Sequence, residues 1–296
     1  MPVLSIQSIS KSYGRVQALK NVNFEVPAGS VYGILGPNGS GKTTLLATVL
    51  NVLLADSGSY SWFGGLPPAE ARRRIGSLLE TPNFYHYMSA YDNLGITAAI
   101  RQRGEGDRLR VLEQVGLLQR KDSKFQTFSL GMKQRLAIGA ALLGRPDVLV
   151  LDEPTNGLDP VGIAEIRELI KVLNKQGTTI IIASHQLDEI EKVCTHVAIL
   201  KHGTLLLNRP VDEVMRSEEQ VEVMAADMAE LKKVISEMPG LTTIKASEGV
   251  LLLTCEHGIG AADINEYCIK NGVVLSQLML RKRSLESKFM ELTNAQ

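Results

Sequence analysis

The amino-acid sequence predicts an α/β protein with a mixed sheet, followed by a smaller α+β module. Two short, largely apolar runs, at 148–151 and 178–183, are typical of parallel strands that are buried on both faces. Helical patterns lie between these runs and after them, as in β-α-β units. After about residue 213, shorter strands and helices follow in a different order. We therefore expect two domains, at residues 1–213 and 214–296.

The composition favours a globular protein with a sizeable core and gives no support for a nucleic-acid partner. Hydrophobic residues make up 44% of the chain, and 32 basic side chains balance 32 acidic ones. Proteins that bind nucleic acids usually have a basic excess. The basic runs at 72–74 and 281–283 are of a kind that more often forms solvated surface. No nucleic acid is therefore expected among the partners.

The cysteines and the apolar pattern bear on the compartment. Cys194, Cys255 and Cys268 form no C-x-x-C pair, so we interpret them as buried free thiols in a reducing compartment. The N-terminus does not resemble a signal peptide, and no apolar run approaches the roughly 18–20 residues that span a bilayer. We expect a cytoplasmic protein whose membrane role, if it has one, comes through a partner.

The first strands are expected at residues 3–10 and 22–26, where apolar and polar side chains alternate. They are predicted to form an antiparallel β subdomain that leads into a short apolar strand at 31–35. Tyr13 falls in the turn between the first two strands, where its ring is able to stack on a nucleotide base. A tyrosine that only packs locally in its turn is the alternative.

A glycine-rich loop follows the strand at 31–35 and precedes a helix. It reads G-x-x-x-x-G-K-T, the phosphate-binding pattern called Walker A. Its glycines allow positive φ and close approach of the backbone, so that N–H groups and the helix N-terminus point at phosphate oxygens. Lys42 is expected to reach the β- and γ-phosphates, and the Thr43 hydroxyl to hold Mg²⁺. A glycine-rich turn without a ligand is the alternative. The predicted nucleotide-binding residues are Tyr13, Gly36, Pro37, Asn38, Gly39, Ser40, Gly41, Lys42, Thr43 and Thr44.

The middle of the first domain, at about 84–145, is expected to be a helical subdomain without sheet strands. One helix there opens with a capping box at Ser89 and Asp92. A second helix is predicted at 105–119, with an apolar face made of Leu109, Leu112, Val115 and Leu118. The other expected elements of the domain are strands at 58–65 and 75–79, helices at 69–74, 128–143, 161–175 and 187–193, and a hairpin at 197–207.

The second domain is expected to have the order β-α-β-β-α-β, which suggests a small ferredoxin-like module. Cys255 and His257 lie close together in its sequence, but two such residues do not make a metal site. Its strands are predicted at 220–224, 241–246, 250–254 and 273–279, its helices at 228–238 and 261–271, and a final amphipathic helix at 284–292.

The strand at 148–151 ends in two carboxylates, as a Walker B strand does. Asp152 is placed to hold Mg²⁺, directly or through water, and Glu153 to accept a proton from an attacking water. An ordinary charged strand end is the weaker alternative.

Five features follow one another along the chain: the segments 36–43, 129–134, 148–154, 157–160 and 184–185. Together they resemble the ATP-binding subunit of an ABC transporter, over roughly residues 3–210. The resemblance implies a P-loop NTPase fold of the ABC type and a head-to-tail dimer of two such subunits, most simply two identical ones. ATP and Mg²⁺ lie between them, and a separate integral membrane permease is the partner. The subunit is then cytoplasmic and peripheral on the inner face of the membrane.

The same resemblance implies roles for residues beyond the Walker motifs. Asp159 matches the D-loop, His185 matches the switch histidine that hydrogen-bonds γ-phosphate, and Tyr13 matches the aromatic residue that stacks on adenine. The signature motif, usually written L-S-G-G-Q, corresponds to Ser129, Leu130, Gly131, Met132, Lys133 and Gln134. The predicted catalytic residues are Lys42, Glu153 and His185, and the predicted metal ligands are Thr43, Glu80 and Asp152.

Two residues depart from the family pattern. Leu130 replaces the first glycine of the signature motif, which points to weaker ATP-driven closure of the dimer. Glu80 stands where the family usually has glutamine, in the loop that touches both the metal and the membrane subunit. A glutamate there, with the extra C-terminal module, resembles the branch that exports peptide antibiotics, including bacitracin- and lantibiotic-resistance transporters. A neutral variant without meaning for the substrate is the alternative.

Two other classes of protein remain to be weighed. A soluble ABC-type ATPase that acts on ribosomes or DNA typically has two cassettes or a long coiled coil, and this sequence has one set of motifs and no sustained heptads. A non-catalytic nucleotide-binding regulator is disfavoured because Lys42, Asp152, Glu153 and His185 are all present. The transported substrate and the direction of transport are not given by the sequence.

Overall fold

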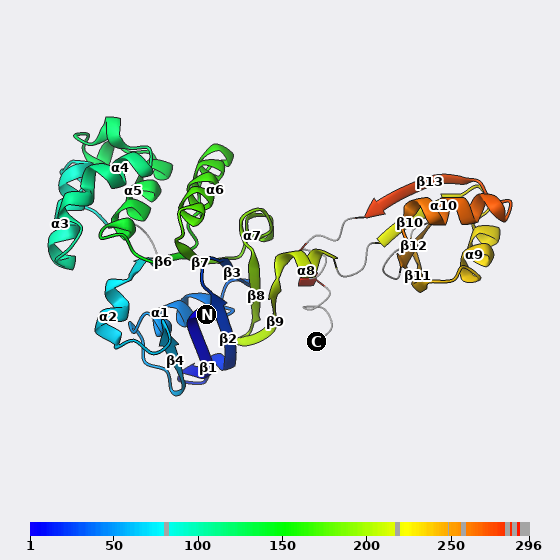
Figure 1. Cartoon of the computed structure of the whole chain (residues 1–296), viewed down its shortest axis with the longest axis horizontal. Helices are drawn as coiled ribbons and strands as arrows, with labels where there is room; N and C mark the ends of the chain where they lie inside the picture. Colours follow the sequence, from blue (N-terminus) through cyan, green and yellow to red (C-terminus); the bar gives the residue numbers. More distant parts are fainter. Residues whose placement is uncertain are drawn as a thin grey trace. The chain divides into compact units, whose positions relative to one another are not determined.

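The computed structural model describes residues 1–79, 83–216, 220–247, 249–255, 259–281, 285 and 289–290. The chain divides into two compact units, Met1–Pro210 and Val211–Gln296, each with a hydrophobic core of its own (Figure 1). The second unit begins with α8 (Val211–Arg216), a helix that the sequence pattern does not predict. The boundary expected after residue 213 falls inside this helix.

A six-stranded mixed sheet forms the centre of the first unit. Five of its strands are parallel, and the last, β9, runs antiparallel to β8, so the predicted mixed sheet is confirmed. All side chains of β3, β6 and β7 are buried, as expected for parallel strands with both faces covered. The strands, in their order across the sheet, are β5 (Ile75–Leu78), β6 (Val148–Asp152), β7 (Thr179–Ser184), β3 (Val31–Leu35), β8 (His196–Lys201) and β9 (Thr204–Pro210).

A second, three-stranded antiparallel sheet has the order β2-β1-β4, and it confirms the predicted N-terminal β subdomain. Its strands are β1 (Pro2–Tyr13), β2 (Val16–Pro27) and β4 (Ser57–Trp62). Tyr13 ends β1 instead of lying in the turn, because Tyr13 pairs with Val16 and only Gly14 and Arg15 make the turn. Gly14 has φ +59°, a conformation that glycine adopts without strain.

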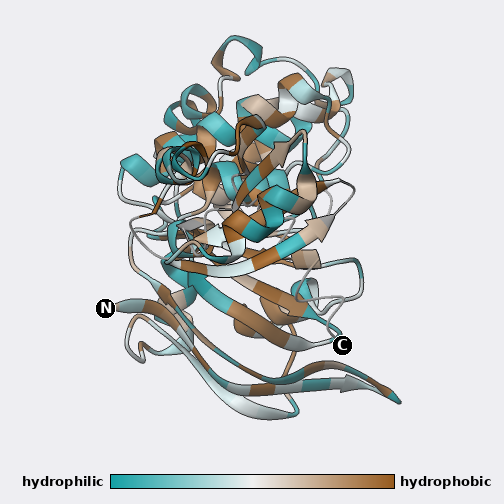
Figure 2. Ribbon diagram, turned by 90° about the vertical axis from the view of Figure 1, so that its right-hand side faces the viewer, coloured by the Kyte–Doolittle hydropathy of each residue, from teal (hydrophilic) through white to brown (hydrophobic). Residues whose placement is uncertain are grey.

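Four helices of the first unit accompany the two sheets. They are α1 (Lys42–Val49), α2 (Pro68–Arg73), α6 (Pro160–Lys175) and α7 (Leu187–Val193). α6 is amphipathic, with Ile166, Leu169, Ile170 and Leu173 buried. In the ribbon coloured by hydropathy, brown and teal residues are mixed along the helices (Figure 2).

The helical subdomain comprises α3 (Ala90–Arg101), α4 (Arg108–Gln114) and α5 (Leu130–Leu142), with 3₁₀ turns at Glu105–Asp107, Leu118–Arg120 and Phe125–Thr127. Within described residues 83–145 there is no sheet strand, only an isolated bridge between Ser89 and Lys124. Ser89 caps α3 by accepting a hydrogen bond from the Asp92 N–H, in line with the predicted capping box.

The single helix predicted at 105–119 is wrong. Gly116, which follows the C-cap residue Val115 of α4, adopts φ +67°, and this left-handed residue ends the helix. The predicted apolar face is wrong at Leu109, which is 50% exposed, whereas Val111 and Leu112 are fully buried. The leucine pattern runs over two short segments that do not form one helix.

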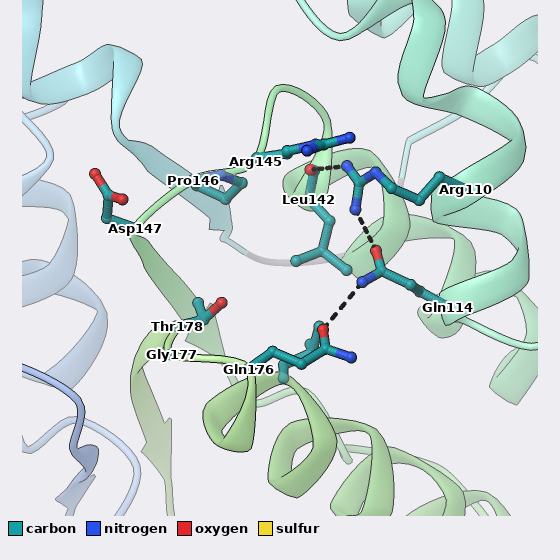
Figure 3. Close-up of a pocket in the computed structure, with 10 residues that line it drawn as sticks. Arg110, Gln114, Leu142, Arg145, Pro146, Asp147, Gln176, Gly177 and Thr178 are labelled. Atoms are coloured by element: carbon teal, nitrogen blue, oxygen red, sulfur yellow. Dashed lines mark hydrogen bonds between the residues drawn. The ribbon is translucent and has the colours of Figure 1, made fainter.

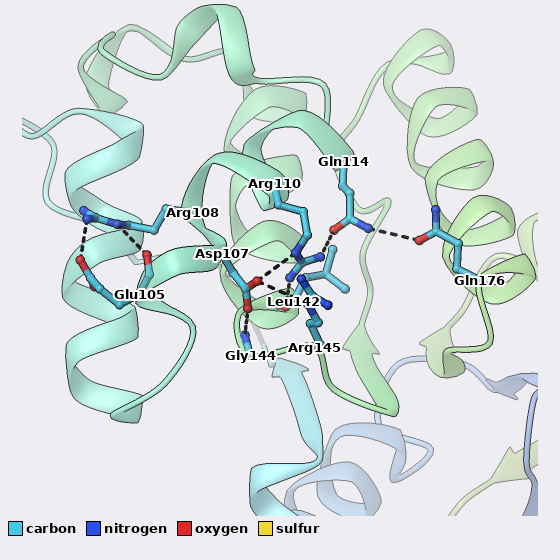
Figure 4. A network of polar contacts seen from close by, with 9 residues as sticks. All are labelled: Glu105, Asp107, Arg108, Arg110, Gln114, Leu142, Gly144, Arg145 and Gln176. Carbon is cyan, nitrogen blue, oxygen red and sulfur yellow. Dashed lines mark hydrogen bonds and ion pairs between the residues drawn. The ribbon is translucent and has the colours of Figure 1, made fainter.

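A polar network joins the start of α4 to the connection between α5 and β6 (Figure 4). Asp107 accepts hydrogen bonds from Arg110 Nε (3.0 Å) and from the Gly144 N–H (3.1 Å), and Arg145 lies 3.5 Å away. Burial acts to raise the pKa of Asp107, but these donors and charges outweigh it and hold the pKa below its usual value. Gln114 Nε2 donates to Gln176 Oε1 (3.2 Å), which links α4 to the end of α6.

After α8, the described part of the second unit contains a four-stranded antiparallel sheet and the helices α9 and α10. In chain order its elements are β10 (Gln220–Ala225), α9 (Met228–Ser236), β11 (Leu241–Ser247), β12 (Val250–Cys255), α10 (Ala261–Lys270) and β13 (Leu275–Arg281). The sheet order is β11-β12-β10-β13, and all neighbouring strands are antiparallel. Its core lies between one face of the sheet and the helices, and includes Val221, Val223, Leu231, Leu253 and Ile264.

The three cysteines are buried, as the sequence analysis predicts. Cys194, Cys255 and Cys268 are buried and form no disulfide among the described residues, and burial raises the pKa of the Cys194 thiol. In the part of the chain that the structure describes, no helix combines the length and the apolar character needed to cross a bilayer.

Candidate nucleotide site

The predicted phosphate loop lies between β3 and α1, and its glycines are required by close contacts. A Cβ on Gly36 would lie 2.3 Å from the Leu200 carbonyl oxygen and 2.5 Å from Ser40 Oγ. Gly41, which precedes α1, has φ +107°, and a Cβ there would lie 2.4 Å from the Ala18 oxygen. Gly39 has φ +77° but faces open space. The loop is therefore pressed against the protein at its two ends and open in its middle, which suits the approach of a ligand.

Lys42 is held inside this loop. Its side chain is only 6% exposed, and Nζ donates hydrogen bonds to the Gly36 and Pro37 carbonyl oxygens (2.8 and 3.3 Å). Nζ also lies 3.4 Å from Glu153 Oε1. A buried ammonium that contacts backbone carbonyls and one carboxylate is in position to bind an anion that enters the loop.

Thr43 and Asp152 join the loop to the end of β6. Thr43 Oγ1 donates to Asp152 Oδ2 at 2.6 Å, and the Asp152 side chain is buried. The hydroxyl of Ser40, in the same loop, is buried and has no hydrogen-bond partner among the described residues. Oxygen atoms of this kind suit Mg²⁺, which takes few protein ligands and fills its other positions with water and phosphate oxygens. One carboxylate and one hydroxyl beside the phosphate loop fit this mode.

Glu153 lies between Lys42 and His185. Its Oε2 is 2.8 Å from His185 Nδ1, and its N–H donates to the Ala183 oxygen at 2.9 Å. Glu153 has φ +47°, which is rare for a residue with a side chain and is maintained only where the surroundings hold it. Glu153 and His185 each follow the carboxyl end of a strand, and β6 and β7 are neighbours in the sheet. The structure therefore brings together Lys42, Thr43, Asp152, Glu153 and His185.

The sequence motifs do not predict the contacts of Glu153. Walker B and the switch position identify Glu153 and His185 singly, whereas their pairing and the ion pair with Lys42 come from the strand order β6-β7-β3. In the sequence, the pairing of Glu153 with His185 is indicated only by the position of each residue directly after a buried strand. The carboxyl ends of adjacent parallel strands meet at one edge of the sheet.

The signature residues form the start of α5. Ser129 is the N-cap, and its Oγ accepts from the Met132 N–H at 3.3 Å. Gln134 is buried, and Lys133 Nζ lies 5.4 Å from the Phe125 ring centre. None of the hydrogen bonds and ion pairs found among the described residues joins residues 129–134 to the loop at 36–43.

Asp159 caps α6 in the same way, with Oδ1 accepting from the Gly162 N–H at 2.9 Å. Leu130, which is 47% exposed, lies close to Gly157, since a Cβ on this glycine would be 3.3 Å from Leu130 Cδ2. The signature segment and the D-loop of one chain are therefore neighbours, with exposed surface at Leu130.

Tyr13 is 49% exposed, so one part of its ring is accessible for stacking. Lys11 Nζ lies 5.9 Å from the ring centre and 2.8 Å from Asp56 Oδ1. Glu80, His257, Lys282, Arg283 and most of the helix predicted at 284–292 lie outside the described residues.

A cavity of about 350 Å³ lies away from these residues (Figure 3). Asp147 and Thr178 in its wall precede β6 and β7, whereas Asp152 and His185 lie at or after the carboxyl ends of these strands. The cavity therefore lies at the amino ends of these strands, opposite the candidate site, and none of the predicted site residues lines it. Its wall also includes Arg110, Gln114, Leu142, Arg145 and Gln176.

The fold and the site define a P-loop nucleotide-binding protein, with the loop between β3 and α1 and carboxylates at the end of β6. A family model described as "ABC transporter" matches residues 19–156. The bacitracin transport ATP-binding protein BcrA of Enterococcus faecalis is 33% identical over 98% of this chain and 96% of its own length. The lantibiotic transport ATP-binding protein SrtF of Streptococcus pyogenes is 40% identical over 71% of this chain and 92% of its own length.

Solved structures agree with this assignment. CbiO1 from Clostridium perfringens, part of the ABC transporter complex cbiONQ, has a TM-score of 0.66 at 30% identity, covering 80% of this chain and 96% of that chain. A dimeric post-hydrolysis structure of the cassette MJ0796 with ADP and Pi has a TM-score of 0.62 at 26% identity, covering 70% and 98%. The chain belongs to the family of ABC transporter ATP-binding subunits, and it is an ATPase. The alternative of an ATPase that acts on ribosomes or DNA is not favoured.

Proposed function

We propose that two copies of this chain bind two Mg-ATP molecules between them and hydrolyse them to drive a separate membrane permease. The observation that supports this most is the meeting of Lys42, Thr43, Asp152, Glu153 and His185 at one edge of the central sheet. Gly36 and Gly41 have no room for a side chain, so the phosphate loop beside these residues can take its conformation only with glycine at both positions.

In the proposed site, the loop from Gly36 to Thr43 cradles the phosphates of ATP and Thr44 follows at the start of α1. Backbone N–H groups of the loop and the Lys42 ammonium bind the phosphate oxygens. Lys42 already contacts two backbone carbonyls and Glu153, so an incoming phosphate replaces partners of a preformed cation. Tyr13 stacks on the adenine, for which its exposed ring is available.

Glu153 is the proposed general base. Its carboxylate accepts a proton from the water that attacks the γ-phosphorus, while His185 donates a hydrogen bond to the γ-phosphate. The 2.8 Å contact between His185 Nδ1 and Glu153 Oε2 keeps the two side chains together before nucleotide binds. Lys42 has to exchange its contact with Glu153 for the phosphates, which frees the base for the water.

Thr43 and Asp152 are the proposed holders of Mg²⁺, with Glu80 as a further candidate. When bound, the ion neutralises charge on the phosphate oxygens. The existing contact between the Thr43 hydroxyl and Asp152 means that both oxygens reach one point beside the loop.

The second half of each site comes from the partner subunit in this proposal. Ser129 and Gly131 face the γ-phosphate bound by the other copy, and Leu130 to Gln134 and Asp159 lie at the contact between the copies. An exposed Leu130 beside Gly157 is consistent with surface reserved for a partner. The dimeric MJ0796 structure shows that a related cassette assembles in pairs.

The permease and the substrate are proposed from the relatives. BcrA is a bacitracin transport protein and SrtF a lantibiotic transport protein. We therefore propose export of a peptide antibiotic, or of a drug or lipid-like molecule of similar size, with the chain bound to its permease at the inner face of the cell membrane. The segment 80–93 and the helical subdomain pass the closure of the dimer to the permease.

Glu153→Gln tests this function. The variant should bind Mg-ATP but hydrolyse it about 10²–10⁴-fold more slowly, because the amide cannot take the proton. It should also accumulate as a closed dimer with ATP. Phosphate release and gel filtration of the variant check both results. Glu168→Gln on the exposed face of α6 is the matched control, and near-normal turnover in Glu153→Gln would contradict the base assignment.

A further inference from the structure

β13 is an edge strand of the second unit with an unusual exposed surface. It pairs with β10 at one end of the order β11-β12-β10-β13. Three consecutive large apolar side chains on it are exposed: Leu278 by 36%, Met279 by 52% and Leu280 by 51%. An open strand edge with apolar side chains is a template for pairing with another strand.

The opposite edge of the same sheet is protected. β11 carries exposed Thr243 and Lys245, and its pairing with β12 is irregular between Leu241 and Thr243. A lysine and an irregularity are both devices by which proteins prevent edge pairing. From Leu275 to Leu280, β13 has no charged residue, no glycine and no proline, and its pairing is regular from Gln277 to Leu280. β13 also has one irregularity, between Leu275 and Gln277, and it ends at Arg281, so the two edges differ in the lysine in the middle of β11 and the uncharged run of β13.

The apolar residues of β13 continue the core of the unit outwards. Leu278 is paired with Val223 and Leu280 with Val221, and both valines are fully buried in the core cluster. Paired residues of antiparallel strands share a face of the sheet, so both leucines lie on the core face. Their exposure shows that this core face is incompletely covered along its β13 edge. Met279 is paired with Glu222 and lies on the other face.

We propose that β13 pairs antiparallel with β13 of a second copy of this chain, about a two-fold axis at Met279. In this register Leu278 lies opposite Leu280 of the partner subunit, and Met279 lies opposite its own counterpart. Each pair joins residues of the same face, so the two sheets become one continuous sheet with the helices of both modules on one side. The row formed by Val223 and Leu278 then continues into Leu280 of the partner subunit. This leucine packs beside Leu278 and covers the exposed edge of the core face.

The strand sequence favours a second copy as the occupant. A two-fold pairing is isologous: where one residue faces a second residue of the partner subunit, that second residue faces the first in return. About an axis at Met279, this sets apolar side chains against apolar ones, because residues 278–280 read Leu-Met-Leu. If the register shifts by one residue, Gln277 lies opposite Leu280 of the partner subunit. Residues of opposite faces are then paired, so one module is turned over and the two core faces no longer lie on the same side.

This pairing does not involve ATP, so it goes beyond the proposed nucleotide-bound dimer. One strand pair buries much less than the roughly 1,600 Å² of a standard interface. We therefore expect a weak contact, with a dissociation constant of roughly micromolar size for the free chain. Two subunits held on one permease would pair more completely, because their effective concentration is roughly millimolar.

A cysteine cross-link tests the register. Met279→Cys in the full chain should form a disulfide-linked dimer under mild oxidation without nucleotide, since the two-fold axis sets position 279 against itself. Lys245→Cys is the matched control: Lys245, Leu252, Glu222 and Met279 are successive pairing partners in one row across the sheet, so both substitutions lie on the same face but at opposite edges. The native cysteines are buried, and the unsubstituted chain gives the background.

Sedimentation of the unmodified chain tests the association without a new cysteine. We expect a reversible, nucleotide-independent dimer, and Met279→Lys should raise its dissociation constant at least about tenfold because two like charges meet on the axis. Lys245→Glu should leave it unchanged. Equal cross-linking at positions 245 and 279, no cross-link at position 279, or a monomer at about 100 µM would each overturn the proposal. ATP hydrolysis is measured separately, so failure here does not touch the proposed function.

Discussion

Gly36 shows how one residue without a side chain shapes the phosphate loop. We expect Gly36→Ala to destabilise the first unit by about 1–3 kcal/mol and to weaken ATP binding, because the new methyl group meets the Leu200 oxygen and Ser40 Oγ. Gly106→Ala is the control, since a methyl group added there has no atom within 4 Å and the φ of Gly106 is not positive. Thermal unfolding followed by Trp62 fluorescence and binding of a fluorescent ATP analogue measure the two effects. Equal melting temperatures for the two variants would contradict the steric argument.

Lys42 is the residue on which phosphate binding depends most directly. Lys42→Ala should lose most of the ATP affinity or turnover, because the site then lacks its buried cation and Glu153 loses a positive neighbour. Equilibrium binding of ATP and phosphate release measure this loss. Lys171→Ala, which removes an exposed lysine paired with Glu168 on α6, should change neither quantity. Unchanged hydrolysis in Lys42→Ala would count against the loop as the nucleotide site.

At this scale the sequence predicted the identity of the residues better than their contacts. The motifs placed Lys42, Thr43 and Asp152 in one site, since each is defined by a short spacing next to a strand. The positive φ of Glu153 and its contacts with Lys42 and His185 depend on which strands are neighbours in the sheet. Local spacing contains no information on that order.

Asp107 decides how firmly one element, α4, is attached to the connection between α5 and β6. Its pKa in the folded protein lies below the usual value of about 3.9, so its contribution to stability is present above about pH 4 and is lost as the pH falls through the lowered pKa. Asp107→Asn should cost about 1–3 kcal/mol at pH 7, because hydrogen bonds to a charged group are lost. This difference from the unmodified protein should shrink below about pH 4.

Urea unfolding at pH 7 and at pH 3–4 measures the effect of Asp107→Asn. Trp62 is the only tryptophan and is buried in β4, so its fluorescence reports the first unit alone. Asp188→Asn, which breaks an exposed pair with Lys192, should have little effect at either pH. A cost that stays the same at pH 3–4 would show that Asp107 acts through packing and not through its charge.

Elements were predicted well where a buried strand or a cap defines them. The strands β3, β6 and β7 and the helix α7 appear where their apolar patterns place them. The prediction failed at 105–119, where the left-handed Gly116 ends α4 and the leucine pattern continues beyond it. It also missed α8, whose six residues, Val211–Arg216, are too few to show a helical period.

The whole molecule combines a site-bearing unit with a second unit that has a separate core. The relatives differ in the share of this chain they match: BcrA covers 98% of it, whereas SrtF covers 71% and is itself matched over 92% of its length. The match with SrtF therefore leaves more than a quarter of this chain unmatched. The change of pattern after residue 213 was visible in the sequence, but the strand order that exposes β13 at an edge was not.

A shortened chain ending at Arg216 separates the roles of the two units. All described candidate site residues lie within Met1–Pro210, and so does the described core cluster that packs around the two sheets. The cut after α8 divides none of the helices and strands that the structure describes. We expect the shortened chain to bind Mg-ATP within about threefold of the full chain's affinity, because about 1.4 kcal/mol is needed for a tenfold change and no contact to the nucleotide is removed.

The nucleotide-independent dimer should disappear, since β13 is absent, while ATP should still bring two Glu153→Gln copies together. Equilibrium binding and sedimentation with and without nucleotide measure these results, and a shortened chain that is folded by Trp62 fluorescence but does not bind ATP would show that the second unit takes part in the site.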